Sequence, residues 1–157
     1  MTTLHTTIDT PIGPLLLTGD GDVLHGVRFG DGPIDPAWHH DAAAFACVTT
    51  QLHEYFHDGR TTFDLAIELR GTPFQVAVWE QLRAIPYGET ISYGELAQRV
   101  GRPSAVRAVG ATNGRNPIPV IVPCHRVIGA DGSLTGFGGG LPVKRALLDL
   151  ELTPSLF

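Results

Sequence analysis

The hydrophobic pattern of the chain changes at Arg70-Gly71, and this change constrains the fold more than any other feature of the sequence. Before it, short apolar or alternating runs are separated by glycine and proline turns, which predicts a small β-rich lobe over residues 1–71. After it, helical segments with clear start signals predict a second domain over residues 72–157. The sequence therefore predicts an α+β protein with two domains.

The N-terminal lobe is expected to contain strands, one helix and a returning strand. A helix is predicted from Asp41 to about His57, where Asp58-Gly59 ends it. The expected strands are Thr6–Thr10, Leu15–Thr18, Val23–Phe29 and Phe63–Leu69.

The C-terminal domain begins with a strong helix signal. Thr72-Pro73-Phe74-Gln75 offers an N-cap threonine, proline at the first helical position and glutamine three residues after the cap. Ser92-Tyr93-Gly94-Glu95 predicts a second capping box for a short helix to about Val100. Ser104 is expected to cap a third helix to about Asn113. Two short helices joined by a tight turn predict a helix-turn-helix, and Pro142–Leu152 a final amphipathic helix.

The segment around the second cysteine has a different pattern. Asn116-Pro117-Ile118-Pro119 is followed by Val120-Ile121-Val122-Pro123, and the three prolines exclude a helix. The β-branched run predicts a buried extended segment that ends at Cys124.

The net charge of −5 hides an asymmetry between the two parts of the chain. Residues 1–72 carry three basic and ten acidic side chains, whereas residues 73–157 carry eight basic and six acidic ones. Between Glu95 and Asp131 there is no acidic residue, and this stretch predicts either a positive binding face or an ordinary solvated surface. Its arginines are Arg99, Arg102, Arg107, Arg115 and Arg126.

The lack of a visible targeting signal and the use of cysteine both favour a cytoplasmic location. No apolar run approaches the roughly 20 residues that a bilayer span requires, and residues 1–20 lack the pattern of a secretory signal. The two cysteines, Cys47 and Cys124, do not form a disulfide framework. On an alanine-rich helix, Cys47 is expected to be a small buried hydrophobic residue.

Cys124 is the candidate nucleophile, with a buried structural thiol as the alternative interpretation. It lies between Pro123 and His125, in a segment without a nearby acid. Adjacent side chains of an extended segment point to opposite faces, so contact between Cys124 and His125 requires a bridging water or a turn at the cysteine. His125 also needs an orienting acceptor. Glu151 is the best candidate, because its spacing from Leu147 and Leu148 places it on the inward face of the last helix.

Pro123-Cys124-His125-Arg126, within Ile121–Gly129, resembles the active-site signature of the methylated-DNA–protein-cysteine methyltransferases, the O6-alkylguanine-DNA alkyltransferases. The resemblance extends over Thr72–Leu152. It implies a ribonuclease-H-like N-terminal lobe and a winged-helix-like C-terminal domain. Its other segments are Pro86–Tyr93, Ala108-Val109-Gly110, Asn116-Pro117 and Gly138–Leu141.

The resemblance implies a role for each matching residue of the reaction centre. Cys124 would accept the alkyl group of O6-alkylguanine, with O4-alkylthymine as a further candidate substrate. His125 would deprotonate the thiol through a bound water, and Glu151 would orient the histidine. Asn116 would brace the turn before the active site, and Tyr93 would assist protonation of the leaving guanine. The alkylated cysteine is a thioether, so the protein would be consumed in one turnover.

The resemblance also implies double-stranded DNA as the partner, bound in the minor groove with little sequence preference. Arg107 would enter the base stack in place of the flipped nucleotide. On pattern alone, the small side chains of the third helix would fit either a DNA groove or a protein core. The other DNA-contacting residues would be Ser104, Arg102, Ala105, Gly110 and Tyr93, and the base pocket would be lined by Val127, Phe137, Gly138 and Pro119.

One position departs from the family pattern. Phe137 stands where many members have tyrosine, so we expect this position to affect the substrate range and not the activity itself. The cysteine ligands of the zinc site found in some relatives are absent too. We expect a monomer that needs no metal, cofactor or membrane.

Two rival functions remain as alternatives. His53-Glu54-Tyr55-Phe56-His57 matches the His-Glu-x-x-His pattern of zinc metalloproteases. The longer variant of that pattern is absent, and Glu80 is the one further ligand that the sequence suggests. The second rival is a sensor that binds alkylated bases without repairing them, but such proteins carry another residue at the position of Cys124.

Overall fold

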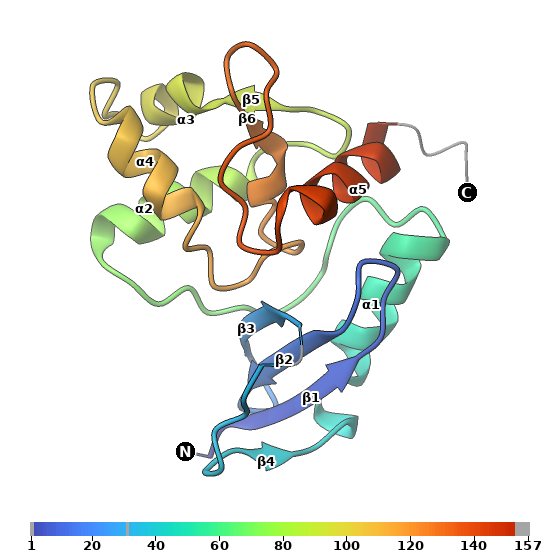
Figure 1. The fold of residues 1–157 in the computed structure, drawn as a ribbon. Helices are drawn as coiled ribbons and strands as arrows, with labels where there is room; N and C mark the ends of the chain where they lie inside the picture. The colour runs from blue at the N-terminus through green and yellow to red at the C-terminus, as the bar shows by residue number, and fades with distance from the viewer. Residues whose placement is uncertain (1, 31, 153–157) are drawn as a thin grey trace. The chain divides into compact units, whose positions relative to one another are not determined.

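A computed structural model describes residues 2–30 and 32–152, and it divides into an N-terminal unit, Met1–Leu69, and a C-terminal unit, Arg70–Phe157. The architecture is the predicted mixture of a small sheet and a helical part (Figure 1). Within the described residues, no helix is long and apolar enough to cross a membrane.

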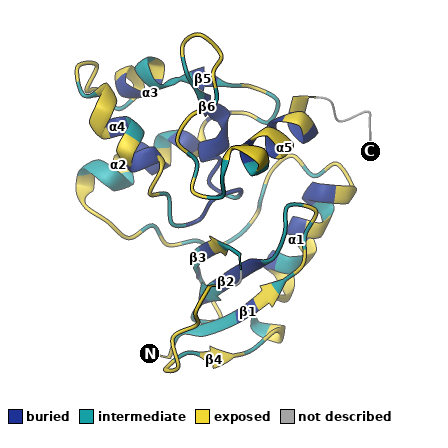
Figure 2. Cartoon of the chain, in the orientation of Figure 1, coloured by how far each residue is buried: buried dark blue, intermediate teal, exposed yellow. Residues whose placement is uncertain are grey.

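The N-terminal unit is built on a four-stranded sheet in the order β3-β2-β1-β4. Its strands are β1 (Leu4–Ile8), β2 (Leu15–Gly19), β3 (Leu24–Phe29) and β4 (His39–His40). The strands β1, β2 and β3 pair antiparallel, and β4 pairs parallel to β1. Leu15 and Leu17 of the central strand β2 are fully buried, and Figure 2 shows this strand mostly in the colour of buried residues. The three longer strands confirm the expected ones to within a few residues.

The helix of this unit is shorter than expected. A 3-10 turn, η1 (Ala43–Phe45), precedes α1 (Ala46–His57), so the segment from Asp41 is not one continuous helix. The Asp41 carboxylate accepts a hydrogen bond from the Ala44 backbone at 3.2 Å, which ties it to the 3-10 turn and not to the α-helix. The helix then ends before Gly59, whose φ of +77° favours glycine.

The prediction of a strand at Phe63–Leu69 is wrong, because this segment does not form a regular strand. The expected alternation of exposure is present, but pairing is limited to one parallel bridge between Leu24 and Ile67. The reason lies in Gln51 of α1, whose side chain donates to the Asp64 carbonyl at 3.0 Å and accepts from the Asp64 amide at 2.9 Å. A side chain therefore satisfies backbone groups that a neighbouring strand would otherwise bind.

The C-terminal unit packs four helices around a two-stranded parallel sheet. The helices are α2 (Pro73–Arg83), α3 (Tyr93–Arg99), α4 (Val106–Asn113) and α5 (Leu141–Leu152). The sheet pairs β5 (Ile91–Ser92) with β6 (Val127–Ile128). The Trp79 indole of α2 donates to the Thr112 carbonyl of α4 at 2.9 Å, which joins these two helices inside the core.

The predicted helix starts are correct to different degrees. The Thr72 capping box is complete, with the side chains of Thr72 and Gln75 each bonded to the other residue's backbone amide. Ser92 accepts from the Glu95 amide at 3.1 Å, but the Glu95 carboxylate pairs with Arg99 at 3.2 Å. Ser104 does not cap α4. The helix starts later, with Ala105 at the N-cap position and no side-chain cap.

The expected extended segment before Cys124 is a tight turn. The Val122 amide donates to the Ile118 carbonyl at 2.9 Å, and Pro119 and Val122 form an isolated bridge. Val120 adopts a φ of +71°, a backbone conformation that β-branched residues rarely take. The β-branched pattern suggested a strand, but the prolines and this turn fold the chain back on itself.

The capping box gives a direct test of the start of α2. Thr72→Ala should lower the free energy of unfolding by about 1 kcal/mol, because the Gln75 amide loses its side-chain acceptor. Urea denaturation followed by circular dichroism measures this loss. Thr61→Ala is a suitable control, because its side chain is exposed and we find no hydrogen bond to it in the described residues. Equal stability of the two variants would contradict the role given to the cap.

Candidate active site

Cys124 lies in a one-turn 3-10 helix, η2 (Cys124–Arg126), which follows the tight turn directly. The turn is closed by hydrogen bonds from the Cys124 amide to the Val122 carbonyl at 2.8 Å and from the Arg126 amide to the Pro123 carbonyl at 3.1 Å. The sequence predicts that contact between Cys124 and His125 needs either a bridging water or a turn at the cysteine, and the chain does turn here. Cys124 and His125 are both buried, with 5% and 0% of their surface exposed.

The buried carboxylate of Glu151, on α5, binds two residues of this turn by hydrogen bonds. Its Oε2 lies 2.7 Å from His125 Nε2, and its Oε1 accepts from Arg126 Nε at 2.7 Å. Arg126 Nη2 donates to Oε2 at 3.0 Å, and Arg126 Nη1 donates to the Ile85 carbonyl at 2.7 Å. The spacing argument therefore placed Glu151 correctly beside His125.

The pKa values of this cluster define its charge state. Burial alone would raise the pKa of Glu151, but the hydrogen bonds from His125 and Arg126 and the positive charge of Arg126 outweigh it and lower the pKa to about 2. Burial lowers the pKa of His125, and its bond to Glu151 only partly offsets this effect. At neutral pH the cluster consequently holds an ionised Glu151, a charged Arg126 and a neutral His125.

The neutral imidazole is fixed in one tautomer. An ionised carboxylate only accepts hydrogen bonds, so His125 Nε2 must carry the proton. His125 Nδ1 then presents a lone pair. This atom is buried and makes no hydrogen bond to the part of the chain that the structure describes. Nδ1 of the residue that follows the cysteine is therefore a basic nitrogen with a lone pair available to take a proton.

The thiol of Cys124 is held in its protonated form. Burial raises the pKa of Cys124 to about 11, although a hydrogen bond from the Asn116 side chain, the charge of Lys144 and the backbone amides of Cys124 and His125 act to lower it. With this pKa about one molecule in 10⁴ is a thiolate at pH 7. The same donors would stabilise the sulfur as it gains negative charge.

Two asparagines brace the backbone on either side of the cysteine. Asn116 Nδ2 donates to the Val122 carbonyl at 2.7 Å, and the Ile118 amide donates to Asn116 Oδ1 at 3.0 Å. Asn113, at the end of α4, donates to the Cys124 carbonyl at 3.4 Å. This last contact joins the arginine-bearing helix α4 to the candidate nucleophile, and the sequence did not reveal it.

Lys144 is a second residue that sequence reasoning missed. It is fully buried, and its Nζ donates to the Val127 carbonyl at 2.7 Å and to the Thr135 carbonyl at 3.0 Å. Burial lowers the pKa of Lys144, while its interaction with Cys124 raises it. The helical spacing could have predicted the burial of Lys144. This residue lies three positions before Leu147 and seven before Glu151, on the same inward face of α5.

Tyr93, at the start of α3, faces the same loop as Lys144. Its hydroxyl donates to the Thr135 carbonyl at 3.0 Å, and Lys144 Nζ lies 5.8 Å from the centre of its ring. Gly110 of α4 packs beside this ring, since a Cβ there would lie 3.6 Å from Tyr93 Cδ1. Tyr93 is half-buried, so its hydroxyl lies at the border between the core and the solvent.

The residues expected to contact DNA lie on or beside α4. Arg107, Ser104 and Arg102 are exposed, whereas Ala105 and Gly110 are half-buried. The Arg102 guanidinium lies 5.9 Å from the centre of the Phe74 ring. Figure 2 shows much of α3 and α4 as exposed.

The positive face is smaller than the sequence suggested. Arg126 does not belong to it, because this side chain is buried and bound to Glu151. Arg99 is paired with Glu95. Within the described residues, the exposed arginines of this stretch that pair with no carboxylate are Arg102, Arg107 and Arg115.

The residues expected to line the base pocket occupy two environments. Val127 of β6 and Pro119 of the tight turn are buried. Phe137 is half-buried and Gly138 is exposed, in the loop that follows Thr135. This loop approaches Tyr93, because a Cβ on Gly136 would lie 3.9 Å from the tyrosine hydroxyl.

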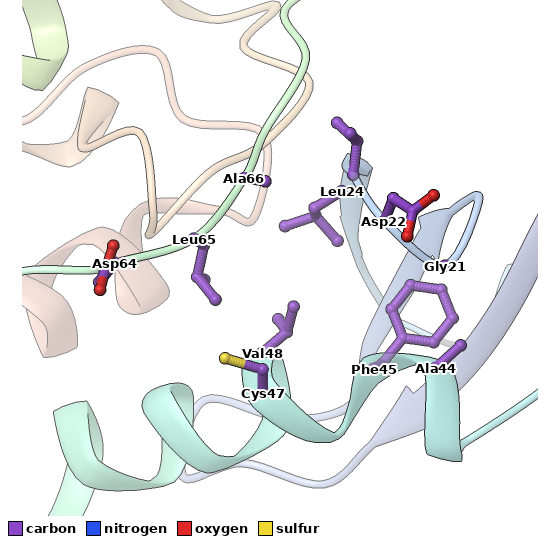
Figure 3. A pocket seen from close by; sticks show the side chains of 11 residues that line it. Gly21, Asp22, Leu24, Ala44, Phe45, Cys47, Val48, Asp64, Leu65 and Ala66 are labelled. Atoms are coloured by element: carbon purple, nitrogen blue, oxygen red, sulfur yellow. The ribbon is translucent and has the colours of Figure 1, made fainter.

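The first cysteine, Cys47, does not match its prediction. The residue is exposed, not buried, and its sulfur accepts a hydrogen bond from Gln51 Nε2 at 3.5 Å. The alanine-rich pattern suggested packing against the core, but Ala42, Ala43 and Ala46 are themselves exposed. Cys47 lines a hollow of about 140 Å³ between α1, the turn before β3 and residues 64–66. Figure 3 shows its side chain among the others that line this hollow.

The His-Glu-x-x-His pattern does not form a protease centre. His53 and His57 lie on α1 with ring centres 4.6 Å apart, but no group of three metal-binding side chains is present in residues 2–30 and 32–152. Glu54, the general base of such a centre, is paired with Arg60 at 3.2 Å. Glu80, the suggested third ligand, is bound to Arg83.

Comparison with known proteins identifies both units. Residues 73–153 match the family described as 6-O-methylguanine DNA methyltransferase, DNA binding domain, and residues 3–69 match its ribonuclease-like domain. The methylated-DNA–protein-cysteine methyltransferase of Mycobacterium tuberculosis is 55% identical over 150 residues, which cover 94% of this chain and 91% of the relative. The protein of the same name from Methanosarcina acetivorans is 48% identical over 147 residues, with coverages of 91% and 94%.

Solved structures agree with this result. The crystal structure of the Mycobacterium tuberculosis O6-methylguanine methyltransferase matches with a TM-score of 0.90 at 53% identity, over 97% of this chain and 94% of that one. A crystal structure of the Mycobacterium tuberculosis OGT in complex with DNA matches with the same TM-score and identity, over 98% and 94%. These matches confirm the predicted α+β fold and the resemblance, and they do not support the protease or the sensor. The chain belongs to the 6-O-methylguanine DNA methyltransferase family.

Proposed function

We propose that this protein repairs alkylated DNA by moving the alkyl group from O6 of guanine to Sγ of Cys124. The bond between the alkyl carbon and O6 breaks, and a bond between that carbon and sulfur forms. The thiol loses its proton to His125 Nδ1, through a bound water, and the leaving guanine gains one with the help of Tyr93. The product is a thioether, a poor leaving group, so each molecule reacts once. O4-alkylthymine is a further candidate substrate.

The observation that carries this proposal is a buried cysteine followed directly by a buried imidazole whose orientation is fixed by Glu151. Glu151 and Arg126 hold His125 with its Nε2 proton directed at the carboxylate, which leaves Nδ1 as the acceptor. Glu151 also stabilises the imidazolium that forms during the reaction. Asn116 supports the turn and donates to the sulfur, so the developing thiolate has partners already in place.

We infer that α4 enters the minor groove of double-stranded DNA. The alkylated carbon points into the duplex, so the base must rotate out of the stack, at a cost of a few kcal/mol. Arg107 would fill the space that the base leaves, while Ser104, Arg102, Ala105 and Gly110 contact the backbone and the groove. These contacts read phosphates and shape, so little sequence preference is expected. The match to a relative crystallised with DNA supports this assignment.

The flipped base would be received between Tyr93, Val127, Pro119 and the loop with Phe137 and Gly138. Phe137 offers no hydroxyl, so the loop would hold the base through its backbone amides. We infer that the protein acts as a monomer in the cytoplasm, where a reducing environment keeps the Cys124 thiol free. The proposed chemistry uses groups of the protein and a bound water, and calls for no metal or organic cofactor.

The first test identifies the acceptor. After incubation with a duplex that contains O6-methylguanine, mass spectrometry should find one added methyl group, located on the peptide with Cys124. Cys124→Ser should abolish the transfer, and Cys47→Ser should leave it intact, because the exposed Cys47 lies in the other unit. Catalytic turnover, or a methyl group on another residue, would refute the proposal.

The dependence of the rate on pH follows from the charge states. With the pKa of Cys124 raised to about 11 and that of His125 lowered, the neutral pair is the main form across neutral pH. The single-turnover rate constant should therefore stay flat from about pH 7 to about pH 9 and fall in acid as His125 becomes protonated. A rise of roughly tenfold per pH unit over this range would instead indicate that the Cys124 thiol, with its raised pKa, ionises to solvent before the transfer, without proton transfer to His125.

The role of Arg107 is tested by comparing two substrates. Arg107→Ala should lower the ratio of the rate on duplex DNA to the rate on free O6-alkylguanine base by roughly 10-fold to 100-fold, because the cost of extruding the nucleotide is no longer offset. Arg115→Ala removes another exposed arginine, just after α4, and should preserve the ratio. Equal ratios in both variants would remove Arg107 from the flipping step.

A further inference from the structure

His53 and His57 of α1 have no part in the proposed reaction, yet their arrangement is specific. They lie one helical turn apart, and their ring centres are 4.6 Å apart with the planes tilted by 45°. Both are exposed, whereas Tyr55 and Phe56 between them are buried at 1% and 5% exposure. The buried pair fixes the orientation of the helix, so the two imidazoles face the solvent on the same side.

The two histidines share a hollow with an acidic residue. Together with Asp9 and Thr10, which follow β1, they line a cavity of about 70 Å³ at the end of α1. The helix ends at His57, so its last carbonyl groups place partial negative charge beside this hollow. The N-terminal unit carries ten acidic residues against two arginines, Arg28 and Arg60. The local field therefore attracts cations.

We propose that His53 and His57 chelate a divalent transition metal of the Cu²⁺, Ni²⁺ or Zn²⁺ type. Imidazoles four residues apart on a helix can bind one ion through one nitrogen each, and imidazole is a preferred ligand for these metals. Ca²⁺ and Mg²⁺ are not expected, because they require oxygen ligands. Asp9 lies close enough to the hollow to favour the bound charge.

The proposed site is open and exchangeable. No third metal-binding side chain joins the two histidines in the described part of the chain, so water would complete the coordination. Glu54 stays bound to Arg60, so the bound metal would have no general base and would not support hydrolysis. Binding to the folded form alone would stabilise the last turn of α1 and raise the melting temperature as the metal concentration increases.

The test uses the untagged full chain in a Cys47→Ser background, which removes the exposed thiol as a competing ligand. Isothermal titration with Ni²⁺ should show one binding event per chain, and His53→Ala or His57→Ala should each weaken it by roughly tenfold or more. His39→Ala/His40→Ala is the matched control. It also removes two exposed histidines, but neighbours on a strand point to opposite faces and cannot chelate one ion.

A second measurement guards against misfolding. Without metal, the circular dichroism spectrum and melting temperature of His53→Ala should match those of the parent, and only the increase with Ni²⁺ should disappear. Unchanged Ni²⁺ binding in the His53→Ala/His57→Ala double variant would overturn the proposal. Loss of binding in the His39→Ala/His40→Ala control would do the same, because the ion would then bind at β4.

Discussion

A carboxylate removed from water holds the reaction centre together. Glu151 is almost fully buried, and an isolated charge at such a position would be strongly destabilising. Its two oxygens are satisfied by His125 and Arg126, which are consecutive residues of the turn that begins with the nucleophile. The requirement to pair one buried charge therefore fixes the position of α5 against the turn and the tautomer of the histidine. Removal of either partner would leave part of this charge uncompensated.

This pairing helps to explain how the buried cysteine can stay unreactive in the free protein and still react with a bound substrate. A low pKa would make the thiol reactive at all times, and open to oxidation. Burial raises the pKa of Cys124 to about 11, so the free protein keeps the proton on sulfur. In the proposed reaction, the neutral His125, with Nδ1 free, supplies the acceptor when an electrophilic carbon is in position. Reactivity then depends on the correct placement of a substrate, as a protein that reacts once requires.

The sequence predicted well those features that local interactions decide. The Thr72 capping box and the inward stripe of α5 depend only on neighbours along one helix, and both are present. The errors arose where distant groups compete with local preference. Gln51 takes the backbone bonds of Asp64, which suppresses a strand, and Glu151 draws Arg126 away from the surface. The turn at Val120 could not be predicted from its sequence, because its β-branched residues favour strands. The buried Val120 nevertheless adopts a positive φ.

Glu151 and Lys144 lie on the same inward face of α5, two helical turns apart. This face therefore places opposite charges about 10 Å from each other along the helix. Each is satisfied by a different part of the segment after Pro123: the carboxylate by η2, and the ammonium by the carbonyl of Val127. The ammonium also binds the Thr135 carbonyl, to which Tyr93 donates. The helix is therefore located by directional polar contacts at both ends of this stripe, where apolar packing alone would allow it to slide. A shift of α5 would move Glu151 and Lys144 together, and this couples the orientation of His125 to the loop that we propose as a wall of the base pocket.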